Sequence, residues 1–210
     1  MRRQRDRDAW PAGGRASARP RRVRVPGGGQ AEVRPDRARC AACGRTQALL
    51  PAWCVPRRSC SADVIGAALL AGARGLGHRR IAELVQVPAA TARDWLRGLA
   101  RGAAGLTAQA ITAAAGADIL PGRPLRSELA GTLAALGAAA RWFARSTLPC
   151  PPPPALTGID YLALLAARHW NELEQRLRIA DPGQRLPALP PWHVVNLITA
   201  GRLLTAAPHG

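Results

Sequence analysis

The chain has 210 residues, of which 30 are basic and 13 are acidic, and its formal net charge at pH 7 is +17. This length is sufficient for a buried core. The sequence shows neither the apolar segment of a signal peptide nor an uninterrupted apolar run of about 20 residues, so we expect a cytoplasmic protein with no membrane partner.

The positive charge is concentrated in the first half of the chain. All 30 basic residues are arginines, a bias that a G+C-rich coding sequence produces without any function. Their distribution is more informative. Residues 1–101 hold 21 arginines against 7 acids, a net +14, whereas residues 102–210 hold 9 against 6, a net +3. Because clustered positive charge attracts polyanions, we expect the first half to carry the binding surface.

The first 60 residues predict a basic arm followed by a short β-hairpin. Residues 1–21 are rich in Arg, Gly and Pro and are expected to be disordered, either touching phosphates or forming a solvated tail. Small or apolar residues then alternate with polar ones around a glycine-rich turn at 26–29: Val23, Val25, Ala31 and Val33.

A C-x-x-C-G knuckle follows the hairpin, with Cys40 and Cys43 placed to share one zinc ion. A structural zinc takes four ligands, but no cysteine precedes the hairpin to supply the usual second pair. Cys54 and Cys60 lie downstream and would complete a site of four thiolates. We therefore predict a partial zinc ribbon over residues 22–60. The alternative is a decayed or truncated ribbon that binds no metal.

Residues 61–101 predict a three-helix domain that contains a helix-turn-helix. Ser61 is suited to cap the first helix, and an apolar stripe follows it. In the stretch 75–99, Pro88 marks the first turn of a new helix, which puts the break at Gln86 and Val87. The motif usually has Gly at the turn, and Gln86 costs roughly 1 kcal/mol if its backbone is left-handed.

The second helix of this pair is predicted to bury Trp95 and Leu96 and to present a small, basic face to the major groove. Arg79 and Arg80 open the helix before it and are placed to contact phosphates. The remaining residues predicted to bind DNA are Ala89, Ala90, Thr91, Arg93, Asp94 and Arg97. The alternative interpretation is a generic pair of amphipathic helices joined by a short turn.

The second half predicts further helices. Residues 102–124 are interpreted as a linker with at most one short helix, and residues 125–210 as a helical region interrupted by a polyproline spacer at 150–154. Apolar stripes predict helices over 125–145, 156–179 and 191–204. These helices are expected either to pack as a small bundle or to form a self-association surface. The expected fold class is thus mainly α, with a short N-terminal hairpin.

The sequence resembles a family of uncharacterised actinobacterial proteins, often encoded beside transposase genes, that join a zinc ribbon to a helix-turn-helix. The resemblance covers about residues 20–100. It rests on Cys40-x-x-Cys43-Gly44-Arg45-Thr46, Leu49-Leu50-Pro51, Val64-Ile65-Gly66, Gly77-His78-Arg79-Arg80-Ile81-Ala82, Pro88-Ala89-Ala90-Thr91 and Arg93-x-Trp95-Leu96. The family's ribbon begins with an earlier cysteine pair, which is absent here. The resemblance implies DNA binding in association with a mobile element.

The predicted function is that of a non-enzymatic DNA-binding protein, either an accessory factor of a mobile element or a transcriptional regulator. Its expected partners are double-stranded DNA and either a second copy of the chain or a transposase. One alternative is a fragment of a transposase-like polynucleotidyl transferase, which needs three separated acids to hold metal ions. Asp160, Glu172 and Asp181 are the strongest candidates for that trio. A structural RNA-binding protein is the other alternative.

Overall fold

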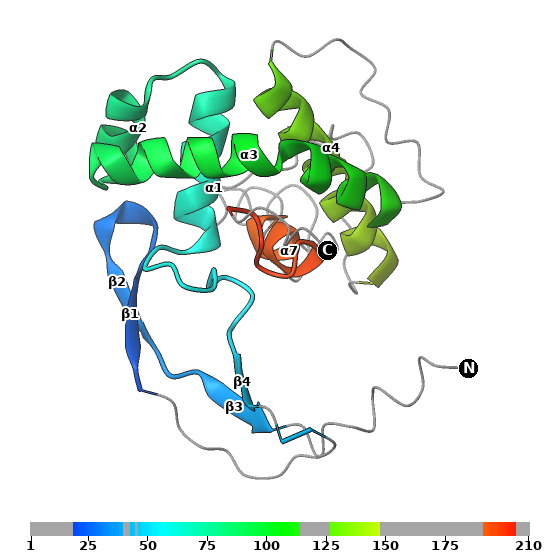
Figure 1. Cartoon of the computed structure of the whole chain (residues 1–210). Helices are drawn as coiled ribbons and strands as arrows, with labels where there is room; N and C mark the ends of the chain where they lie inside the picture. Colours follow the sequence, from blue (N-terminus) through cyan, green and yellow to red (C-terminus); the bar gives the residue numbers. More distant parts are fainter. Residues whose placement is uncertain (1–18, 40–42, 45, 114–126, 148–190, 205–210) are drawn as a thin grey trace, which may run out of the picture.

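The computed structural model describes residues 19–39, 43–44, 46–113, 127–147 and 191–204. It is mainly helical, with two β-hairpins at its N-terminal end, which confirms the expected fold class (Figure 1). The basic arm up to residue 18, the polyproline spacer and the helix expected over 156–179 lie outside the described residues.

The first hairpin has the strands and the turn predicted from the alternation of its residues. β1 (Arg21–Arg24) pairs antiparallel with β2 (Gln30–Val33), and the turn η1 (Pro26–Gly28) joins them. Val23 and Val33 are buried on one face, where they pack with Cys54. The alternation therefore marks the side of the hairpin that faces the protein.

A second hairpin surrounds the C-x-x-C-G segment. β3 (Asp36–Arg39) pairs antiparallel with β4 (Thr46–Leu49), and Arg39 lies opposite Thr46 next to the connection. The sequence did not predict these strands, because they show little alternation of apolar and polar residues. Cys43 and Gly44 of the knuckle lie in the connection between these strands, and the hairpin lies below the helices in Figure 1.

The three predicted helices of residues 61–101 are present. In α1 (Ala62–Ala73), the N–H of Val64 donates to the Oγ of Ser61 over 3.3 Å, so Ser61 caps the helix as expected. α2 (His78–Val85) ends at Gln86, whose backbone is left-handed with φ 53° and ψ 49°. The break between α2 and α3 thus falls at the predicted residue.

α3 (Ala89–Ala113) is longer than predicted. The linker expected over 102–124 is corrected to a continuous helix as far as Ala113, because this part of α3 packs against α4 (Glu128–Thr147). Leu106 and Ala110 of α3 are buried in the same apolar core as Leu133 and Leu136 of α4. Tertiary packing thus stabilises a helix that its own glycines weaken.

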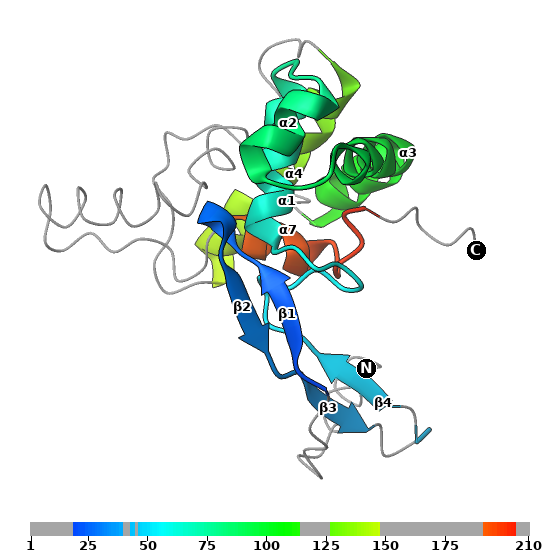
Figure 2. The ribbon, with the colours of Figure 1, turned by 90° about the vertical axis from the view of Figure 1, so that its left-hand side faces the viewer.

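One apolar core joins the helix-turn-helix to the end of the chain. α7 (Pro191–Ile198) packs against α1 and α4, and its Trp192 is fully buried (Figures 1 and 2). Trp192 lies so close to Gly66 of α1 that a side chain at Gly66 would overlap the indole ring. The C-terminal region, expected as a segment separate from residues 61–101, shares their core instead. The last predicted helix also ends earlier, at Ile198 rather than at residue 204.

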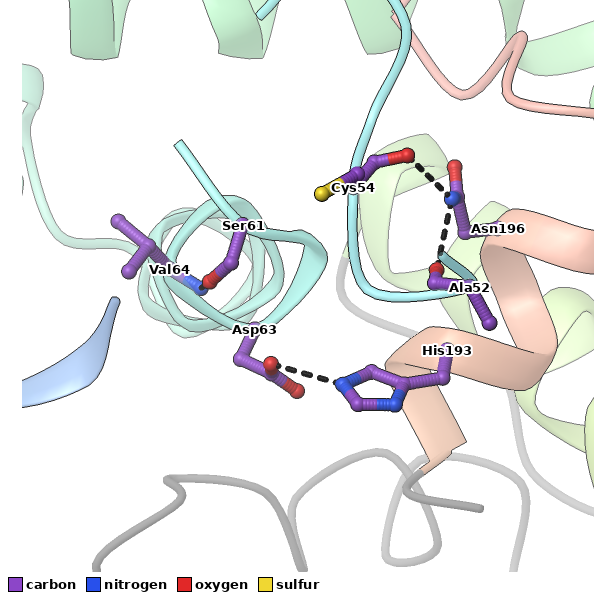
Figure 3. Close-up of polar contacts among 7 residues, drawn as sticks. All are labelled: Ala52, Cys54, Ser61, Asp63, Val64, His193 and Asn196. Carbon is purple, nitrogen blue, oxygen red and sulfur yellow. Dashed lines mark hydrogen bonds and ion pairs between the residues drawn. The ribbon is translucent and has the colours of Figure 1, made fainter. Parts of the chain in front are cut away.

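Polar contacts fix α7 on the start of α1 and on the loop before it (Figure 3). His193 Nε2 lies 3.0 Å from a carboxylate oxygen of Asp63, and both side chains are largely buried. The Asn196 side-chain amide donates to the backbone oxygens of Ala52 and Cys54 over 2.8 and 3.1 Å. Because these partners are more than 120 residues apart in sequence, the contacts hold the two ends of the core together.

Candidate nucleic-acid interface

The first turns of α3 have one buried and one exposed face. Ala92 and Leu99 are fully buried and Trp95 is 2% exposed, and all three belong to the main core. Arg93 and Arg97 are exposed on the opposite face. The helix therefore buries its Trp and presents its arginines to solvent, as the helix-turn-helix interpretation requires.

The structure leaves most of the predicted DNA-binding residues accessible. Two of them, Ala89 and Thr91, are only half-exposed, and Ala89 packs against the core. Their backbone positions still lie at the start of α3. The exposed residues of the set are Arg79, Arg80, Ala90, Arg93, Asp94 and Arg97.

Sequence reasoning missed one further arginine on this face. Arg101 is exposed on α3 and lies four residues after Arg97, which itself lies four residues after Arg93. Residues at this spacing share one side of a helix, about 6 Å apart along its axis. The spacing is visible in the sequence, but the predicted three-helix domain ends at residue 101, which hides the continuation of this row along α3.

The charged groups of this surface are solvated and weakly paired. Arg80 lies 3.9 Å from Glu83, and Arg93 Nε lies 3.9 Å from a carboxylate oxygen of Asp94. All four side chains are at least 47% exposed. Such exposed pairs contribute little to stability. Among the described residues, Arg79 and Arg97 have no ion-pair partner.

Three of the four predicted zinc ligands, Cys43, Cys54 and Cys60, lie in the described residues. Cys54 packs with Val23 and Val33, whereas Cys60 belongs to the main helical core. Cys43 is exposed in the connection between β3 and β4. Cys40 lies outside the described residues. In the part of the chain that the structure describes, no group of three or more His, Cys, Asp or Glu side chains is placed to hold a metal ion.

Cys54 and Cys60 are both buried. Loss of solvent raises the pKa of both thiols, and the nearby charges of Arg21 and Arg24 lower the two pKa values by a smaller amount. Zinc binds the thiolate and displaces the thiol proton, so the pKa of a metal-free thiol does not decide whether zinc binds. The four-cysteine site, which involves Cys40, stays a prediction.

The acids considered for a catalytic trio, Asp160, Glu172 and Asp181, lie outside the described residues. Within the described ranges, no helix is both long and apolar enough to cross a bilayer. Comparison with protein-family models, curated proteins and solved structures gives no match. The resemblance to a mobile-element family therefore stays a prediction.

Proposed function

We propose that this protein binds double-stranded DNA, with the first turns of α3 in the major groove. The observation that carries the proposal is the division of this helix into a buried face with Trp95 and an exposed face with Arg93 and Arg97. A left-handed turn at Gln86 connects it to α2, as in helix-turn-helix proteins.

The side chains on this surface suit both parts of DNA recognition. The guanidinium groups of Arg93 and Arg97 have the geometry to donate two hydrogen bonds to guanine in the major groove. The small side chain of Ala90 allows the helix to approach the base edges closely. Arg79 and Arg80, exposed at the start of α2, are placed to bind phosphates and to fix the register of the protein on the duplex.

The biological role that we propose is that of an accessory factor of a mobile element or a transcriptional regulator. This role follows from the family resemblance of residues 20–100. A second copy of the chain or a transposase is the proposed protein partner. Dimeric helix-turn-helix proteins bind paired half-sites about one helical turn apart, so a footprint of that spacing supports the dimer.

Fluorescence anisotropy tests the proposal with duplexes of roughly 20 bp enriched from a randomised pool. We expect tighter binding to the enriched duplex than to an unselected duplex or to double-stranded RNA. Arg93→Ala and Arg97→Ala are expected to reduce this discrimination by about 1–3 kcal/mol each. Arg79→Ala is expected to weaken binding to all duplexes alike.

Arg37→Ala is the matched control, since Arg37 is also exposed but lies on β3, away from α2 and α3. Arg37→Ala removes the same charge as Arg93→Ala, and we expect it to leave the preference for the enriched duplex over the unselected duplex unchanged. Equal losses from Arg37→Ala and Arg93→Ala would show attraction by net charge alone and would refute groove binding by α3.

A further inference from the structure

The β1–β2 hairpin is held firmly on the helical core. The backbone N–H of Arg24 donates to the Ser59 oxygen over 2.7 Å, and the N–H of Ser61 donates to the Arg24 oxygen over 2.9 Å. The Arg21 guanidinium also donates to the backbone oxygens of Val55 and Arg58. These contacts tie the hairpin to the residues that lead into α1, so its position relative to the helices is fixed.

The closed end of this hairpin lies beside the turn between α2 and α3. The turn η1 contacts α2, and Gly28 lies directly against the side chain of Gln86. A Cβ atom at Gly28 would overlap the Gln86 Oε1, and Gly28 also has a φ of +82°. Glycine therefore suits this position for both its small size and its backbone conformation.

The same side of the molecule presents the hairpin and the start of α3 (Figure 2). In that view α3 is seen along its axis beside α2, and the closed end of the hairpin lies below α2, with α1 between it and α3. A helix-turn-helix inserts the N-terminal residues of its second helix into the groove. A duplex bound there therefore lies near the closed end of the hairpin as well.

The exposed face of the hairpin is suited to phosphates. Val23 and Val33 occupy the buried face, so Arg22 projects from the other face and is exposed. Glu32, which is opposite Arg22 in the strand register, is paired with Arg34 over 3.2 Å. Gly27, Gly28 and Gly29 at the closed end are exposed, and residues without side chains allow a backbone to approach closely.

We propose that the β1–β2 hairpin is a second DNA-binding element, a wing (residues 21–33) whose Arg22 and glycine turn bind the sugar-phosphate backbone beside the groove that α3 occupies. This inference rests on the proposed DNA binding by α3. The wing contacts phosphates only, so it contributes affinity without reading the base sequence.

The test compares Arg22→Ala with Arg37→Ala. Both residues are exposed arginines, and each is the second residue of a four-residue strand, but Arg37 lies in the other hairpin. We expect Arg22→Ala to weaken binding to every duplex about threefold to tenfold and to reduce the slope of log affinity against log salt by about 1, measured between about 50 and 200 mM salt. Arg37→Ala should change neither quantity.

Arg22→Lys keeps the charge and is expected to restore the salt slope. Thermal unfolding of each variant verifies that the fold is intact. If Arg22→Ala and Arg37→Ala have the same effect while Arg93→Ala still weakens binding, the wing is refuted and α3 binding stands. If Arg93→Ala and Arg97→Ala also have no effect beyond that of Arg37→Ala, the proposed function itself is refuted.

Discussion

Gln86 occupies a backbone conformation that glycine adopts more easily than any other residue. Its φ of 53° ends α2, and the Val87 N–H closes the turn by donating to the Ala82 oxygen over 3.0 Å. The position was recognisable from the sequence because Pro88 fixes the start of the next helix. What the sequence could not reveal is that the Gln86 side chain lies against Gly28.

Gln86→Gly is expected to stabilise the protein by roughly 0.5–1 kcal/mol, because it relieves the left-handed strain at an exposed position. Urea unfolding measures the free-energy change. Gln86→Ala is the control, since it removes the side chain but keeps a Cβ atom at the strained position. It is expected to bring no stabilisation, and a loss of stability in Gln86→Gly would contradict this explanation.

We expect the protein to lose stability at alkaline pH because two of its cysteines, Cys54 and Cys60, are buried. Burial raises the pKa of Cys54 and Cys60 above the ordinary thiol value of 9.0. Above pH 9 the unfolded chain therefore loses these protons while the folded chain retains them, so stability is fully present below that value and decreases as pH rises through the folded-state pKa. The absence of Lys removes the side chains that otherwise titrate most heavily in this range.

We expect the free energy of urea unfolding to fall as the pH rises above about 9, and to fall less steeply in the Cys54→Ala/Cys60→Ala variant. Slopes are compared rather than absolute values, because the alanine substitutions also lose packing. Identical slopes in the two proteins would show that other groups cause the pH dependence.

Among the secondary-structure elements, those with regular apolar spacing were predictable. The alternation around the glycine turn predicted β1 and β2, and the apolar stripes predicted the helices α1, α2 and α4. β3 and β4 were missed because short exposed strands lack alternation. The length of α3 was missed because glycines between residues 98 and 105 lower helix propensity, whereas packing against α4 decides the outcome.

The attachment of α7 could not be predicted, because it depends on contacts between residues far apart in the sequence. Asn196→Ala removes two hydrogen bonds and leaves the Ala52 and Cys54 oxygens without this donor. We expect it to destabilise the protein by about 1–3 kcal/mol in urea unfolding. Leu197→Ala, at the neighbouring residue that is 46% exposed, should change stability by less than about 1 kcal/mol. Similar losses in both variants would contradict a specific role for the amide.

In the whole molecule, the helix-turn-helix and the C-terminal region share one apolar core, although the sequence predicted them as separate regions. The candidate DNA-binding residues were predictable, because exposed arginines at helical spacing follow directly from the pattern of buried positions. The core beneath these residues was not predictable, because the helices that carry them pack in one core with Trp192 and Leu203. Periodicity indicates which face of a helix is buried but not which distant segment covers it.

Trp192→Ala is therefore expected to destabilise the whole protein, helix-turn-helix included, by about 3–5 kcal/mol. Trp142→Ala, at a residue that is 36% exposed on α4, is expected to cost much less. Unfolding followed by both circular dichroism and DNA binding measures the effect. Loss of helical signal without a matching loss of DNA binding in Trp192→Ala would show that the two regions fold independently.

The close approach of Trp192 to Gly66 also has a consequence for how the protein is made. During translation, α1 leaves the ribosome more than a hundred residues before the indole ring that covers it. Folding of the complete core thus waits for the synthesis of residue 192, and a nonsense or frameshift mutation between the codons for Gly66 and Trp192 removes that indole and is expected to destabilise the N-terminal helices as well.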